Sequence, residues 1–225
     1  MTSFFRFSIQ AVVYDFDGTL ADSFLPIRHA FNHMLRHFGH TREVSREETL
    51  ALVGGPLETS VARLLPSPLV SAGTSVFREH YEKISPEMTR PMPGATDLLR
   101  TIAGTGLPQA VVTNKLGASA RELVRHLGWS RLLPLCLGEG DGLPLKPDPA
   151  MLLAAARTLD VPPENLLFVG DSPFDFSAAR KAGSPICLVT TGTHRREELA
   201  RMEPDLLFDS LHELGDWLRE PGTVR

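Results

Sequence analysis

Short apolar runs recur along the chain, and each ends at a polar turn. The first is Ala11-Val12-Val13-Tyr14, which stops at an Asp-Gly turn signal. Runs of this length, bounded by turn signals, are typical of strands buried within a sheet. The same pattern recurs at 110–112, 133–137, 166–169, 186–189 and 206–208. The pattern therefore predicts six strands, of which those at 133–137 and 206–208 have the weaker signals.

Helical patterns separate the later runs, at 117–127, 149–159, 173–182 and 195–202. Asp148 before Pro149 is a good helix start, because it offers an acidic N-cap followed by proline at the first helical position. Strands that alternate with helices indicate an α/β fold, in which helices cover both faces of a parallel sheet.

One connection is far longer than the others. Residues 15–109 separate the first two strands, whereas a strand–helix–strand crossover needs only about 10–12 residues. Helical patterns fill the excess at 25–38, 46–52, 57–65 and about 75–84, before a proline-rich joint at 91–94. We expect residues 22–90 to form an all-helical cap, with hinges near Ala21 and Pro91. Residues 1–21 and 91–225 would form the α/β core.

Composition agrees with a folded, intracellular chain. The 225 residues are 42% hydrophobic, and the net charge of −4 offers no basic stripe for nucleic acid. Cys136 and Cys187 lie in apolar runs, so buried thiols are expected rather than a disulfide. No apolar stretch approaches the roughly 20 residues that span a bilayer, and no signal peptide is evident. We expect a cytoplasmic protein without a membrane partner; nothing indicates its oligomeric state.

Polar side chains follow the strands at the points where the strands end. In an open parallel sheet the ligand crevice lies outside these carboxyl ends. We therefore expect seven groups to face one crevice: Asp15, Asp17, Thr113, Asn114, Lys146, Asp171 and Asp175.

Four carboxylates in one crevice repel one another unless a cation joins them, and all-oxygen ligands suit Mg²⁺. Such an ion would also screen Asp15 from an incoming phosphate. Asp15 could then attack phosphorus, with Asp17 as general acid and base. The Thr113 hydroxyl, the Asn114 backbone N–H and the Lys146 ammonium would hold the phosphoryl oxygens.

Four segments resemble, in order and spacing, the motifs of the haloacid dehalogenase superfamily of phosphatases. They are 15–23 (DFDGTLADS), 113–115 (TNK), 146–149 (KPDP) and 170–175 (GDSPFD). The resemblance covers nearly the whole chain. It implies a Rossmann-like core, a helical cap inserted after the first motif, and Mg²⁺ as cofactor.

The resemblance also implies roles for single residues. Asp15 would be the nucleophile and a metal ligand. Asp17 would be the acid/base, and its backbone carbonyl would also bind Mg²⁺. Asp171 would bind the metal and Asp175 would support it, with Lys146 completing the catalytic set.

Within the superfamily the chain looks most like phosphoglycolate phosphatase-like enzymes. The joint Pro91-Met92-Pro93-Gly94 and the form Thr113-Asn114-Lys115 resemble theirs. Gly54-Gly55-Pro56-Leu57 resembles their cap loop over the active site, so Gly54 and Gly55 are expected to contact substrate. A helix–helix turn is the alternative.

Three histidines, His29, His33 and His37, recur at intervals of four residues on the first cap helix. They would share one helix face. A soft-metal site is one interpretation, but it lacks a clear fourth ligand. The others are that the histidines lie on a half-exposed helix face, or that one of them contacts the substrate.

The favoured function is hydrolysis of a small phosphorylated metabolite, a phosphomonoester such as phosphoglycolate. Pyrophosphate, sugar phosphates and nucleoside monophosphates stay open. A phosphosugar mutase is the first alternative, although mutases usually have Asp-Gly-Val where this chain has Asp17-Gly18-Thr19. A non-catalytic binding protein on the same fold is the second.

Overall fold

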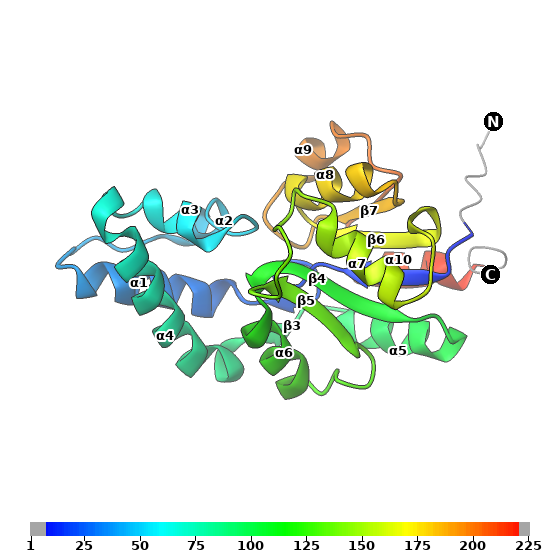
Figure 1. The fold of residues 1–225 in the computed structure, drawn as a ribbon, viewed down its shortest axis with the longest axis horizontal. Helices are drawn as coiled ribbons and strands as arrows, with labels where there is room; N and C mark the ends of the chain where they lie inside the picture. Colours follow the sequence, from blue (N-terminus) through cyan, green and yellow to red (C-terminus); the bar gives the residue numbers. More distant parts are fainter. Residues whose placement is uncertain (1–7, 221–225) are drawn as a thin grey trace.

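The computed structural model describes residues 8–220, which contain a six-stranded sheet in the order β5-β4-β1-β6-β7-β8 (Figure 1). Every neighbouring pair of strands in this sheet is parallel. The strands are β1 (Ala11–Tyr14), β4 (Gln109–Leu116), β5 (Leu135–Glu139), β6 (Leu166–Gly170), β7 (Ile186–Val189) and β8 (Leu206–Phe208). The predicted α/β fold with a parallel sheet is confirmed.

Helices cover both faces of the sheet. They are α5 (Ala95–Thr105), α6 (Gly117–His126), α7 (Ala150–Thr158), η2 (Pro163–Asn165), α8 (Pro173–Ala182), α9 (Arg196–Ala200) and α10 (Leu211–Arg219). Successive side chains of a strand point to opposite faces. Val12 and Tyr14 accordingly pack with α5, α6 and α10, whereas Ala11 and Val13 pack with α7, α8 and α9. Within residues 8–220, no helix has the length and apolarity needed to cross a bilayer.

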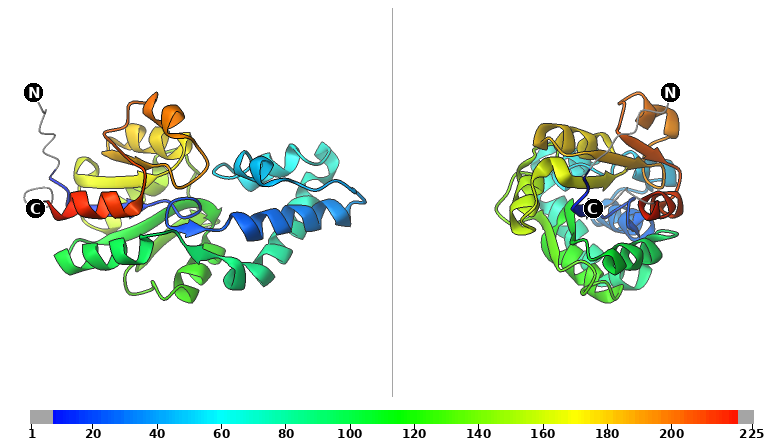
Figure 2. Two further views of the ribbon diagram at one scale, coloured as in Figure 1. Left: turned by 180° about the vertical axis from the view of Figure 1, so that it is seen from behind. Right: turned by 90° about the vertical axis from the view of Figure 1, so that its right-hand side faces the viewer.

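Five helical segments lie beyond one end of the sheet, and all of them except α2 contribute side chains to a separate apolar cluster (Figures 1 and 2). They are α1 (Phe24–His37), α2 (Arg46–Leu50), α3 (Leu57–Ala62), η1 (Ser67–Leu69) and α4 (Val70–Met88). We call residues 22–90 the cap. The chain enters it through β2 (Ala21–Asp22) and leaves it through β3 (Arg90–Pro91), and these two strands pair antiparallel. Independent behaviour of the cap as a domain stays a prediction.

The bounds of some elements differ from those expected. Strand β4 continues past Asn114 because, after a register shift, Leu116 pairs with Glu139 of β5. Helix α7 begins at Ala150 with Pro149 as its N-cap, so the prediction that Asp148 is the N-cap is wrong by one residue. Asp148 still bonds the first turn, because its Oδ1 accepts from the Ala150 N–H at 2.9 Å. Helices α5 and α10 were not predicted.

Both cysteines are buried free thiols, as predicted. Burial raises the pKa of the Cys136 thiol to about 12. The thiolate is the reactive form of cysteine, so Cys136 is structural rather than nucleophilic.

Candidate active site

Buried polar residues gather at the carboxyl ends of the central strands. Asp15 follows β1, Asp171 follows β6, and Asp175 lies in the first turn of α8. These three carboxylates each place an oxygen within 4.8 Å of the others. Thr113, Asn114 and Lys146 are buried with them. The expected convergence of the four motifs on one crevice is therefore what the structure shows.

Asp171 is held by three donors from distant parts of the chain. Its Oδ1 accepts from the Thr19 hydroxyl at 3.0 Å, and its Oδ2 accepts from the N–H and hydroxyl of Thr193 at 2.9 and 3.1 Å. Gly192 has no room for a side chain, because a Cβ there would collide with the Asp171 carboxylate. Neither Thr193 nor Gly192 was predicted from the sequence, since neither belongs to the four motifs.

Asp175 is positioned by the capping box of α8. Ser172 is the N-cap, and Asp175 Oδ2 accepts from the Ser172 N–H at 3.0 Å and from its hydroxyl at 2.6 Å. The same oxygen accepts from the Asp171 N–H at 3.2 Å. The capping box thus fixes Asp175 Oδ2, and Asp175 Oδ1 accepts a hydrogen bond from Lys146 Nζ.

Lys146 is a buried cation shared by two carboxylates. Its Nζ lies 2.8 Å from Asp15 Oδ1 and 2.6 Å from Asp175 Oδ1. Burial alone would lower the pKa of Lys146, but Asp15 and Asp175 raise it to about 12. The lysine is therefore protonated and supplies the positive charge that lets Asp15 ionise beside its neighbours.

One lysine does not balance three buried carboxylates. Burial, followed by the charges of Asp175 and Asp15, raises the pKa of Asp171 to about 8. Burial is also the main reason that the pKa of Asp15 rises to about 6, against the opposing effect of Lys146. Beyond its ion pair with Lys146, Asp15 Oδ1 accepts no hydrogen bond. Converging hard oxygen donors with excess negative charge fit a divalent cation such as Mg²⁺.

The raised pKa values make stability depend on pH and metal together. The folded protein binds protons at Asp171 more tightly than the unfolded chain does, so metal-free stability should fall as pH rises from about 4 to 8. A cation binds the ionised carboxylates, so its stabilising effect should grow over that range. Thermal melts in EDTA and in MgCl₂ across these pH values measure both trends. A metal-induced rise in Tm that shrinks with increasing pH would contradict this expectation. In Asp171→Asn, most of the metal-induced rise in Tm should be lost.

The carboxylate of Asp17 is not among the three that form this acidic cluster. Its two oxygens lie 2.9 and 3.2 Å from Lys115 Nζ, and that ammonium lies 4.2 Å from the centre of the Tyr81 ring. Lys115 was not predicted as a site residue. Because β4 continues to Leu116, Lys115 lies at the carboxyl end of the same strand as Thr113, and both residues line the cleft. The true length of β4 would have revealed it.

Asn114 joins three parts of the site through its side chain. Its Nδ2 donates to the carbonyls of Lys146 at 2.9 Å and of Gly54 at 3.0 Å, while its Oδ1 accepts from the Lys146 N–H at 2.8 Å. The amide therefore fixes the Lys146 loop and attaches the cap loop to the core. The predicted use of the Asn114 backbone N–H for phosphate stays a prediction.

The cap loop at Gly54 and Gly55 lines the same cleft as Asp15. Gly54 has a φ of 104°, a left-handed conformation that favours glycine. A Cβ on Gly55 would lie 3.1 Å from the Phe174 ring, so this loop also approaches α8 closely. Contact between Gly54 or Gly55 and substrate stays a prediction.

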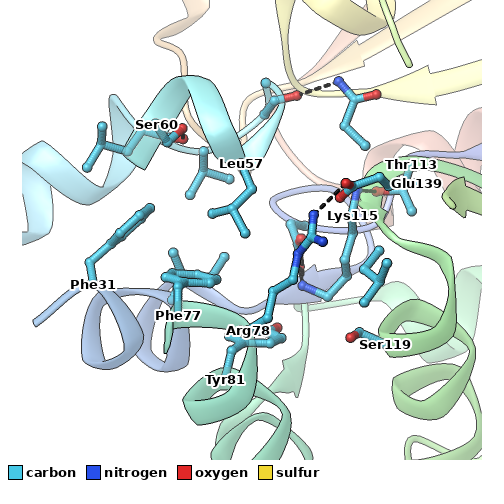
Figure 3. A pocket seen from close by; sticks show the side chains of 18 of the residues that line it. Phe31, Leu57, Ser60, Phe77, Arg78, Tyr81, Thr113, Lys115, Ser119 and Glu139 are labelled. Atoms are coloured by element: carbon cyan, nitrogen blue, oxygen red, sulfur yellow. Dashed lines mark hydrogen bonds and ion pairs between the residues drawn. The ribbon is translucent and has the colours of Figure 1, made fainter. Parts of the chain in front are cut away.

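A cleft runs between the cap and the carboxyl ends of the strands (Figure 3). Asp15, Asp17 and Thr113 lie on its core side, next to Lys115. Arg78 of α4 crosses from the cap and pairs with Glu139 at the end of β5. Arg78, Glu139 and Tyr81 were not predicted, because no motif marks them in one sequence.

The cap histidines do not form a site. His29 and His37 are exposed, and His33 stacks on His80 with ring centres 3.9 Å apart. In the described part of the chain, the acidic cluster alone meets the geometric requirement for a metal site with three or more histidine, cysteine or acidic ligands. No histidine lines the cleft there. The structure thus supports the interpretation as a half-exposed helix face.

Comparison with known proteins identifies the class to which this fold and site belong. The model of the haloacid dehalogenase-like hydrolase family matches residues 12–189, from β1 to the end of β7. The chain belongs to this family. The sequence resemblance and its implied fold are thereby confirmed.

Curated relatives refine this assignment. The phosphoglycolate phosphatase of Nitrosospira multiformis is 33% identical over 93% of this chain and 95% of its own. That of Neisseria meningitidis is 34% identical over 92% of each.

Solved structures agree on the fold. A haloacid dehalogenase-like hydrolase from Streptococcus pneumoniae has a TM-score of 0.86 at 24% identity, covering 94% of this chain and 99% of its own. A mutant of CbbY from Rhodobacter sphaeroides, solved with xylulose 1,5-bisphosphate, has a TM-score of 0.79 at 28% identity, covering 92% and 96%.

Proposed function

We propose that the protein is a Mg²⁺-dependent phosphatase that hydrolyses a small phosphomonoester through an aspartyl-phosphate on Asp15. One observation carries the proposal: the buried Asp15 carboxylate contacts the Lys146 ammonium, belongs to the acidic cluster with Asp171 and Asp175, and lines the cleft. Asp17 reaches the same cleft from two residues away. The relatives named phosphoglycolate phosphatase support this chemistry.

Two displacements at phosphorus account for the reaction. An Asp15 oxygen forms a bond to phosphorus while the bond to the leaving oxygen breaks, and Asp17 gives that oxygen a proton. Water then attacks phosphorus as Asp17 takes its proton. Inorganic phosphate leaves, and Asp15 is a carboxylate again. Because Lys115 contacts both Asp17 oxygens, it holds this proton carrier at the cleft wall.

The remaining polar groups bind and orient the phosphoryl group. The Thr113 hydroxyl and the Lys146 ammonium would hold its oxygens, in the positioning and electrostatic roles that phosphoryl transfer requires. Asp15, Asp171 and the Asp17 backbone carbonyl would hold Mg²⁺, with Asp175 in support. When bound, the ion neutralises negative charge on the phosphate and on the carboxylates.

Phosphate release from an aryl phosphate, with Mg²⁺ or with EDTA, tests the proposal. We expect hydrolysis that disappears in EDTA and returns when Mg²⁺ is added in excess. Equal rates with and without metal would contradict the proposal. Incubation with glucose 1-phosphate separates the alternatives, because a mutase would form glucose 6-phosphate whereas hydrolysis gives glucose and phosphate.

A further inference from the structure

The half of the cleft farther from Asp15 is lined mainly by apolar side chains. Figure 3 shows Phe31, Leu57 and Phe77 together on the cap side, facing the core residues across the cleft. Val53 and Leu57 flank the glycine pair of the cap loop and are half-buried, so they present apolar surface to the cleft. The cap side chains of this kind that line it are Ile27, Phe31, Leu52, Val53, Leu57, Phe77 and Tyr81.

The positive charges of the cleft already have acidic partners. Among the described residues that line it, the cations are Arg78 and Lys115. Arg78 pairs with Glu139 and lies 3.2 Å from Glu58, while Lys115 pairs with Asp17. Lys146, behind the cleft, pairs with two aspartates. Arg78 uses the same nitrogen, Nη2, for both glutamates, so two negative charges already lie beside this one guanidinium. The cleft lining therefore offers no excess positive charge to a second anionic group on the substrate.

A second anion would therefore meet an unfavourable environment. An anion that binds Arg78 would lie beside Glu139, whose side chain is 21% exposed. Glu139 and the anion would then share one guanidinium, and excess negative charge that is partly removed from water is strongly disfavoured. Binding of an apolar group is instead favoured, because burial of its surface against the apolar cap side chains removes that surface from water.

We propose that the enzyme prefers phosphomonoesters whose leaving group is uncharged and largely apolar, and that the Arg78–Glu139 pair rejects carboxylate-bearing substrates such as phosphoglycolate. This inference rests on the proposed phosphatase function and narrows its substrate class. The leaving group is an alcohol of the size of benzyl alcohol, packed against Phe31, Leu57 and Phe77. Arg78 and Glu139 are specificity residues, since they exclude a charge without contacting the reacting atoms.

Matched substrates test the proposal directly. Benzyl phosphate and 4-carboxybenzyl phosphate share the reacting group and differ by one remote carboxylate. We expect kcat/KM for benzyl phosphate to exceed that for 4-carboxybenzyl phosphate and for 2-phosphoglycolate by about tenfold or more, with Mg²⁺ present.

Glu139→Gln tests the proposed cause. The substitution keeps the side-chain shape and removes a negative charge beside Arg78, so a substrate carboxylate should bind there more favourably. The ratio of kcat/KM for 4-carboxybenzyl to benzyl phosphate should rise about tenfold. Glu79→Gln is the matched control, because Glu79 is an exposed residue of the same helix as Arg78 and pairs with Lys83. Its ratio should equal that of the parent.

The outcomes separate this inference from the proposed function. Faster hydrolysis of 2-phosphoglycolate than of benzyl phosphate would overturn the inference and leave the phosphatase function standing. An unchanged ratio in Glu139→Gln would overturn the role of the ion pair. Absence of hydrolysis with any phosphate ester, in Mg²⁺ and with a folded protein, would remove the proposed function itself.

Discussion

Asp15→Asn is expected to lower the rate of phosphate release by roughly four orders of magnitude, because the amide cannot form the bond to phosphorus. The substitution changes few atoms, so Lys146, Thr113 and the acidic cluster stay in place to bind substrate. The loss should therefore appear in kcat, measured with an aryl phosphate at saturating Mg²⁺. Retention of a rate near that of the parent would show that Asp15 is not the nucleophile.

Stability measurements show whether that loss is chemical or structural. Burial raises the pKa of Asp15 to about 6. Above that pH the ionised carboxylate is less favourable in the folded protein than in the unfolded chain, so it lowers the stability of the folded state. Metal-free Asp15→Asn should consequently melt at or above the parent temperature near pH 8. Asp22→Asn supplies the matched control, since Asp22 is exposed in β2 and its replacement should leave the rate unchanged.

Lys146→Met is expected to destabilise the metal-free protein by about 3–5 kcal/mol, because it leaves buried carboxylates without their cation. Lys146 contacts both Asp15 and Asp175, and its side chain is 1% exposed. The destabilisation should be larger at high pH, where the carboxylates of the cluster are ionised. Urea unfolding in EDTA at two pH values measures it. A loss of unfolding free energy below about 1 kcal/mol is typical of an exposed ion pair, and it would contradict the expectation that buried carboxylates are left uncompensated.

Two further variants isolate the charge effect. Lys83→Met removes a lysine from an exposed pair with Glu79, and its effect should stay within about 1 kcal/mol. Adding Asp15→Asn to Lys146→Met should restore part of the stability, since one of the two abandoned carboxylates is neutralised. Strict additivity in this double mutant would argue against a direct Asp15–Lys146 interaction.

Much of the core could be predicted because its local signals are strong. Strands β1, β7 and β8 and helix α8 have the predicted bounds, since each is an apolar run or helical pattern that ends at a turn residue. Helices α5 and α10 carry readable patterns as well. Their buried residues recur at intervals of three and four and pack against each other (Figure 2). They were missed although the signal was present in the sequence.

Other features depend on partners that no local pattern specifies. Strand β4 extends to Leu116 because β5 resumes pairing there, at Glu139. The length of α4 exceeds the predicted 75–84 because its first turns pack on α1 and α3.

The candidate site also contains residues that could be predicted from the sequence and others that could not. Asp15, Lys146, Asp171 and Asp175 could be placed together because parallel strands deliver their carboxyl ends to one edge. The pairing of Asp17 with Lys115 could not be predicted from the sequence, because it depends on the length of β4. The Arg78–Glu139 pair joins residues far apart in the chain, and both residue types are usually solvated.

The paired strands β2 and β3 bear on how this architecture can be re-engineered. They bring the two ends of the cap together, so the cap is a closed loop at the point where it joins the core. Doubling the length of a flexible closed loop costs only about 0.6 kcal/mol in entropy. Foreign helical inserts joined at Asp22 and Arg90 should therefore be tolerated by the core. A library of grafted caps could then change substrate range while the core keeps Asp15, Lys146, Asp171 and Asp175.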